Sequence, residues 1–139
     1  MNWTMWAMLS AVFAALTAIW AKVGVASVDS TVAMAIRTTV VFFLAWLFAL
    51  PRLAGTPLSG LATRTWIFLV LSGVATGASW FCYFRALKLG RASQVAPVDK
   101  LSVVLVLAFA AIFLGERLTM REWCGGGLIA AGVVLMVVK

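Results

Sequence analysis

Five long apolar runs follow one another along this chain, separated by short segments that carry most of its charged residues. A helix needs about 20 mostly apolar residues to cross the hydrocarbon core of a bilayer. The runs predict transmembrane helices over about 3–21, 31–50, 66–87, 93–114 and 123–138. No connecting segment is long enough to hold a soluble domain. We therefore expect an all-α polytopic membrane protein, with one membrane domain over residues 1–139.

Composition argues against a soluble enzyme. Apolar residues make up 65% of the chain and charged residues 11%, against about 45–50% and about 25% in ordinary soluble domains. Because there is no histidine, imidazole metal sites and a histidine proton relay are excluded. Neither a nucleophile–base pair nor an ATP-binding motif is present, so we expect no catalysis, no metal and no cofactor. Cys82 and Cys124 lie in apolar stretches and are interpreted as small hydrophobes.

Local signals mark where several of these helices begin and end. Lys22 is expected to end the first helix, Pro51 the second and Gly90 the third. The pattern Thr119-x-x-Glu122 is a capping box just before the fifth run. The first run is long, lacks a positive segment before it and is followed by Lys22, so we expect a span rather than a cleaved signal peptide.

The net charge of +7 does not indicate nucleic acid, because the basic residues lie between the apolar runs, where lipid headgroups are expected. With five helices the two termini lie on opposite sides. Each side then carries four Lys or Arg residues in its loops or terminus: Arg52, Arg64, Arg117 and Arg121 on one, Lys22, Lys88, Arg91 and Lys139 on the other. Because equal numbers of basic residues bias the direction of insertion only weakly, two interpretations stay open: insertion in one direction, or dual topology with antiparallel pairing.

Four charged residues fall inside the predicted spans: Arg37, Arg85, Asp99 and Lys100. Charges in a bilayer are costly and mark functional sites by default. All four map to the half of the bundle nearer the C-terminal side, where they can form one substrate pocket. Alternatively, Arg37 pairs with Asp99 to hold two helices together while Arg85 and Lys100 extend to the headgroups. As the only acid well inside a span, Asp99 is the expected site of any proton or sodium coupling.

The third span adds aromatic candidates to this pocket. Trp80, Tyr83 and Phe84 lie one or two turns from its end, and we interpret them as pocket wall, with ordinary core packing as the alternative. The other six tryptophans fall near the predicted interfaces, as in any membrane protein. Pro97 either kinks the fourth helix, as in many transporter sites, or sits in its tolerant first turn.

The stretch from Arg85 to Leu105, followed by Phe113-Leu-Gly-Glu116-Arg-Leu-Thr, resembles the EamA-type domain of the drug/metabolite transporter superfamily. The resemblance runs from about Trp3 to Val138. It implies that the chain corresponds to half of a ten-helix transporter built from two inverted five-helix repeats. One unit can recreate the inverted pair if a second copy inserts upside down, so we expect an antiparallel homodimer. An inverted partner encoded elsewhere is the main alternative.

The last helix carries a further resemblance. Gly125 and Gly132 are seven residues apart and lie on one helix face, where small residues let two backbones approach closely. This spacing resembles the dimerising helix of the small multidrug resistance proteins, so both glycines are expected at the dimer interface. Those proteins carry a glutamate in their first helix, whereas residues 3–21 contain no acid. Their proton exchange at that glutamate is therefore not carried over.

Together these features predict a secondary transporter that exports small metabolites by alternating access. We expect it among the lipids of the bacterial cytoplasmic (inner) membrane. The excess of basic over acidic residues favours an amino-acid-like, zwitterionic or amphipathic substrate bearing a carboxylate, with energy drawn from an ion or substrate gradient. The alternative is a non-transporting subunit, or a lipid-carrier flippase component, that pairs with another membrane protein.

Overall fold

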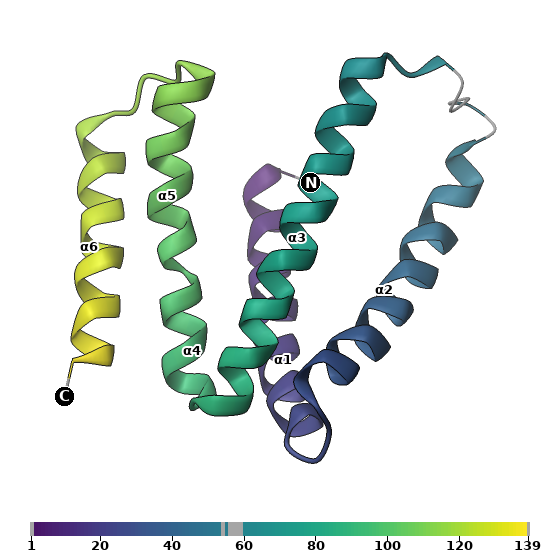
Figure 1. The fold of residues 1–139 in the computed structure, drawn as a ribbon. Helices are drawn as coiled ribbons and strands as arrows, with labels where there is room; N and C mark the ends of the chain where they lie inside the picture. The colour runs from purple at the N-terminus through teal and green to yellow at the C-terminus, as the bar shows by residue number, and fades with distance from the viewer. Residues whose placement is uncertain (1, 54, 56–59, 139) are drawn as a thin grey trace. The chain divides into compact units, whose positions relative to one another are not determined.

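The computed structural model describes residues 2–53, 55 and 60–138, and this part of the chain contains helices and no strand. The helices are α1 (Trp3–Val25), α2 (Ser30–Leu53), α3 (Thr63–Leu89), α4 (Ala92–Asp99), α5 (Leu101–Phe109), the π-helical turn η2 (Ala110–Leu114) and α6 (Met120–Val137) (Figure 1). With α4, α5 and η2 taken as one span, five segments are long and apolar enough to cross a membrane. The predicted five-helix membrane architecture is thus confirmed.

Several helix ends differ from the sequence prediction. α1 continues past Lys22 to Val25, because lysine is a good helix former and its charge does not end the helix. The lysine side chain reaches a carbonyl oxygen of α3. α2 includes Pro51 in its last turn. α6 begins at Met120, since Thr119 is its N-cap and forms the predicted capping box with Glu122. The terminal charge Lys139 lies outside the described residues.

The chain divides into two compact units, Met1–Leu89 and Gly90–Lys139, here called the N-terminal and C-terminal units. In the N-terminal unit α3 packs against both α1 and α2. Its most deeply buried side chains, Val25, Phe84 and Leu87, come from the end of α1 and the last two turns of α3. The packed part of this unit is therefore the end where α1 stops, α2 begins and α3 stops.

Two lysines link α1 and α3 at this end through hydrogen bonds to backbone carbonyl oxygens. Lys22 Nζ donates to the carbonyl oxygen of Leu87 at 2.6 Å. Lys88 Nζ donates to three carbonyl oxygens at the end of α1 and in the following loop, those of Val25 (2.8 Å), Ala26 (2.9 Å) and Val28 (3.0 Å). The last carbonyls of a helix have no partner within it. Each lysine thus supplies donors to the end of the other helix.

In the C-terminal unit α5 and α6 pack along each other. Gly126 is buried at this contact, and a Cβ atom there would lie 2.8 Å from Leu107 Cδ1. η2 ends at Gly115, whose φ of +68° is the left-handed conformation common after helix ends. α4 stops at Asp99 and α5 restarts at Leu101, so Lys100 occupies the break between them.

Little of the apolar surface is covered by the protein itself. Large side chains such as Trp6, Phe48 and Leu135 are 59%, 74% and 81% exposed. Exposed apolar patches of this extent mark contact with a membrane or another protein. The helices therefore rely on lipid, or on another chain, to cover their outer faces.

Candidate functional site

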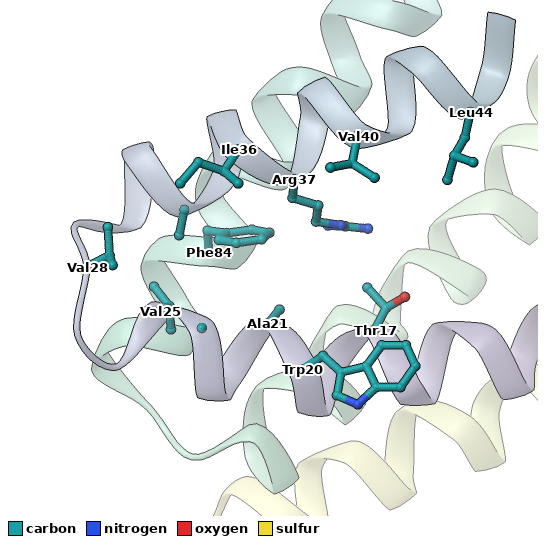
Figure 2. A pocket seen from close by; sticks show the side chains of 12 residues that line it. Thr17, Trp20, Ala21, Val25, Val28, Ile36, Arg37, Val40, Leu44 and Phe84 are labelled. Carbon is teal, nitrogen blue, oxygen red and sulfur yellow. The ribbon is translucent and has the colours of Figure 1, made fainter. Parts of the chain in front are cut away.

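Arg37 lies inside a membrane-spanning helix. It is seven residues after the first residue of α2, or about 10 Å along the axis at 1.5 Å per residue. Its side chain is half-buried, and the guanidinium points into the space between α1 and α2 (Figure 2). The fold therefore holds a full positive charge away from the helix ends.

Two aromatic rings of α3 accompany this charge. Arg37 Cζ lies 4.5 Å from the centroid of the Trp80 ring and 5.5 Å from that of Phe84. Both distances fall within the range of cation–π attraction. Trp80 and Phe84 are four residues apart, so they share one face of α3. The structure thus brings together three of the predicted site residues from two helices.

No carboxylate of the N-terminal unit pairs with Arg37. Asp29 is the only acidic residue among the first 89. It lies in the loop before α2, and its Oδ1 accepts a hydrogen bond from the Thr31 backbone N–H at 2.8 Å. Within this unit, aromatic faces take the place of an anionic partner for Arg37.

The guanidinium faces a cavity of about 480 Å³ within the N-terminal unit. Arg37 supplies its only charge, and the remaining wall is largely apolar. The lining comes from α1, the α1–α2 loop, α2 and one residue of α3: Thr17, Trp20, Ala21, Gly24, Val25, Val28, Ala33, Ile36, Arg37, Val40, Leu44 and Phe84. Most ligand sites have this character, an apolar wall with a few placed polar groups.

A second hollow of about 410 Å³ lies between α2 and α3. Trp80 lines it together with small and polar residues: Met34, Thr38, Leu69, Ser72, Gly73, Thr76 and Gly77. The hydroxyls of Thr38 and Thr76 donate to carbonyl oxygens of their own helices, each at 2.8 Å. Unlike the cavity at Arg37, this hollow has no charged residue in its lining.

The predicted wall residue Tyr83 and the predicted site charge Arg85 lie close to the aromatic pair on α3. Tyr83 is half-buried and Arg85 is exposed. They follow Trp80 within five residues, which places them in the same two turns of the helix. Neither lines the cavity at Arg37.

The remaining candidates belong to the C-terminal unit. Asp99 Oδ2 lies 3.7 Å from Lys100 Nζ, with 39% and 57% of the two side chains exposed. Such exposed pairs contribute little to stability. Pro97 lies three residues before Lys100, where α4 gives way to α5. Among the described residues, no group of three or more His, Cys, Asp or Glu is placed to hold a metal ion.

The two glycines predicted at a dimer interface lie on an open face of α6. A Cβ atom added at Gly125 or Gly132 would meet no heavy atom within 4 Å, whereas one at Gly126 would meet Leu107. The packing of α5 against α6 therefore uses the neighbouring face, on which Gly126 and Val133 are buried.

Sequence reasoning missed most of the cavity wall. Thr17, Ile36 and Val40 line it, but in an apolar run no periodic signal separates a residue facing a cavity from one facing lipid. Thr17 offers the one usable hint, since it is a polar residue inside the first span. The sequence analysis also treated Lys22 and Lys88 only as loop charges, although both bond to carbonyl oxygens of a neighbouring helix.

Comparisons with known proteins agree with this architecture. Residues 1–138 match the EamA-like transporter family. An "Uncharacterized transporter in cobO 3'region" of Sinorhizobium sp. is 54% identical over 138 residues, covering 99% of this chain and 97% of that protein.

A second kind of relative is more distant. A "Probable 4-amino-4-deoxy-L-arabinose-phosphoundecaprenol flippase subunit ArnE" of Yersinia pestis (strain Pestoides F) is 32% identical over 69 residues, or 50% of this chain and 60% of that protein. No solved structure matches the chain. The family match over nearly all of its length and the 54% identical relative show that the chain belongs to the EamA-like transporter family.

Proposed function

We propose that the chain moves a small carboxylate-bearing metabolite across the bacterial cytoplasmic membrane by alternating access, without a catalytic step. The observation that carries this proposal is the position of Arg37. Its guanidinium is inside a span, faces an apolar cavity and has two aromatic rings but no acid beside it in its own unit. A charge kept under such conditions is a binding group by default.

Substrate binding extends from Arg37 to the end of α3. Trp80 and Phe84 position the guanidinium, and Tyr83 and Arg85 line the route into the site from the same helix. Asp99 carries the coupling proton or sodium ion, with Lys100 as a second cation for the substrate. The helix break after Pro97 makes this span discontinuous, and discontinuous helices form the substrate and ion sites of many transporters.

The assembly we propose is an antiparallel homodimer of two oppositely inserted copies. Two observations support it. The sequence assigns four basic residues to the predicted ends of the spans on each side of the membrane, so we expect insertion to be weakly biased. Gly125 and Gly132 leave a face of α6 open to close approach by another helix.

Uptake by proteoliposomes tests the transport proposal. Full-length chain would be reconstituted and screened for flux of labelled carboxylate-bearing metabolites, with and without a proton or sodium gradient. Arg37→Gln and Asp99→Asn are expected to reduce flux at least about tenfold, because hydrogen bonds to charged groups contribute about 1.5–3 kcal/mol. Arg64→Gln is the matched control, since Arg64 also stacks on an aromatic ring, Phe68 at 5.7 Å, but lies outside the cavity. Unchanged flux in both site variants would overturn the assignment.

A second candidate function is that of a membrane subunit in a lipid-carrier flippase. The relationship to the ArnE protein, itself described as a flippase subunit, favours it. This alternative predicts that affinity-tagged chain brings down a different membrane protein in equal amount and forms no homodimer. Recovery of a homodimer that is active in proteoliposomes would exclude it.

A further inference from the structure

We propose that the cavity between α1 and α2 selects an amphiphilic monocarboxylate, whose carboxylate binds Arg37 and whose apolar body lies against the two helices. This inference rests on the proposed transport function and names the substrate class of the same site.

The arrangement around Arg37 favours one carboxylate. Guanidinium binds carboxylates through parallel N–H bonds along the edge of its plane. Trp80 lies over the group at 4.5 Å, and Figure 2 shows the guanidinium directed into the cavity. Because Asp29, the only acid of this unit, lies outside the cavity lining, no carboxylate of the N-terminal unit competes for the guanidinium there.

The same lining disfavours cations and zwitterions. An ammonium group needs a carboxylate or several oxygen acceptors when it leaves water. The lining residues include no acid, and the hydroxyl of Thr17 is their only side-chain oxygen. A substrate with a single negative charge satisfies Arg37, whereas an added positive charge would enter the cavity unpaired.

The rest of the wall suits an apolar body. The volume of about 480 Å³ falls within the range of about 300–1,000 Å³ typical of small-molecule sites. Trp20 and Ala21 come from α1, whereas Ile36, Val40 and Leu44 come from α2. Burial of apolar surface against these side chains favours binding in proportion to the area removed from water.

Gly24 provides a way to fill the cavity without removing the charge. It belongs to the lining, and a Cβ atom at this position would meet no heavy atom within 4 Å. A leucine at this position would therefore occupy the space of the substrate body while Arg37 and its aromatic neighbours stay in place.

Equilibrium binding of radiolabelled octanoate to the full chain, in nanodiscs of phosphatidylcholine, tests the proposal. We expect saturable binding that octanol and octylammonium do not compete. Arg37→Gln should weaken binding at least about tenfold. Arg37→Lys should weaken it less, because it keeps the charge and loses the paired N–H edge. Gly24→Leu should abolish binding, and Arg64→Gln should leave it unchanged.

Several results would overturn the inference. Competition by octylammonium, or unchanged octanoate binding in both Arg37→Gln and Gly24→Leu, would show that the cavity does not select a monoanion. A second binding experiment uses nanodiscs that contain phosphatidylglycerol. If this lipid removes octanoate binding in the wild-type chain, the site belongs to an anionic lipid and the metabolite assignment fails. Should Arg37→Gln lose helicity or thermal stability, Gly24→Leu and Arg37→Lys still decide the question.

Binding and transport can fail separately. Arg37-dependent octanoate binding without flux of any substrate in proteoliposomes would support this inference and remove the transport proposal. Arg37-dependent flux of a zwitterion, with no octanoate binding, would support the transport proposal and remove this inference.

Discussion

Arg37 is the residue on which the proposed function depends. A charged side chain inside a membrane helix is costly, most of all at the helix centre, and Arg37 lies seven residues after the start of α2. Its contacts with the rings of Trp80 and Phe84 offset part of that cost, because a cation–π contact contributes about 0.5–1 kcal/mol when exposed and about 2 kcal/mol when desolvated. A charge kept inside a span agrees with a functional role.

The sequence made Arg37 and the aromatic pair predictable, but not their contact. Arg37 interrupts an apolar run, and the spacing of four residues places Trp80 and Phe84 on one face of α3. Which face of α2 meets them depends on how the two helices are rotated about their axes. In spans that are apolar all round, no hydrophobic periodicity fixes that rotation, so the three-residue cluster required the structure.

Asp29 gives a prediction about pH. The hydrogen bonds from Thr31 hold the pKa of its carboxyl below the ordinary value of 3.8, with a minor contribution from the charge of Arg85. A carboxyl whose pKa is lower in the folded than in the unfolded state stabilises the fold above the unfolded pKa. That stabilisation is lost as the pH falls through the folded pKa. Thermal unfolding of the wild type between pH 7 and pH 2.5 should therefore show a loss of stability below about pH 3.8.

The matched variants are Asp29→Asn and Asp29→Ala. Asparagine keeps the helix N-cap but does not titrate, so this part of the acid-side loss should disappear. Alanine loses the cap and should be less stable than the wild type at pH 7. Identical acid-side profiles for all three proteins would show that Asp29 does not contribute.

At the scale of elements, the hydrogen bonds of Lys22 and Lys88 hold the ends of α1 and α3 together. Lys88→Met removes three donors from carbonyl oxygens that are left without helical partners. We expect a loss of about 1–3 kcal/mol in unfolding free energy, measured by denaturant titration in detergent. Arg91→Met is the control, because Arg91 is exposed and comes just after the same helix. Equal losses in both variants would indicate a general effect of charge.

These elements also show which helix ends can be predicted from local sequence signals. The capping box of Thr119 and Glu122 formed as predicted, because it needs only residues four positions or fewer apart. The expected end of α1 at Lys22 was wrong. Its side chain bonds to Leu87, 65 residues away in the sequence. Rules about local helix ends take no account of a partner so distant in the sequence.

At the scale of the molecule, the five-span architecture and the family could be predicted because both depend on length, hydropathy and motif. The mode of assembly depends instead on a surface that the isolated chain leaves uncovered. Gly125 and Gly132 mark such a surface on α6. Gly126, one residue further along, already packs on Leu107.

We therefore predict that Gly132→Leu converts the proposed homodimer to a monomer while the five helices remain folded, since a Cβ atom added there meets no heavy atom within 4 Å in the described part of its own chain. Gly127→Leu is the control, because Gly127 has equally open surroundings but lies about 200° around the helix from Gly125. Sedimentation in detergent would measure the mass, and circular dichroism the helicity. A dimer that survives Gly132→Leu would exclude this face of α6 as the interface. A dimer lost equally in Gly127→Leu would mean that any bulky residue on the helix disturbs assembly. Loss in Gly132→Leu alone would place the second copy against the glycine face of α6, where small residues allow close helix approach.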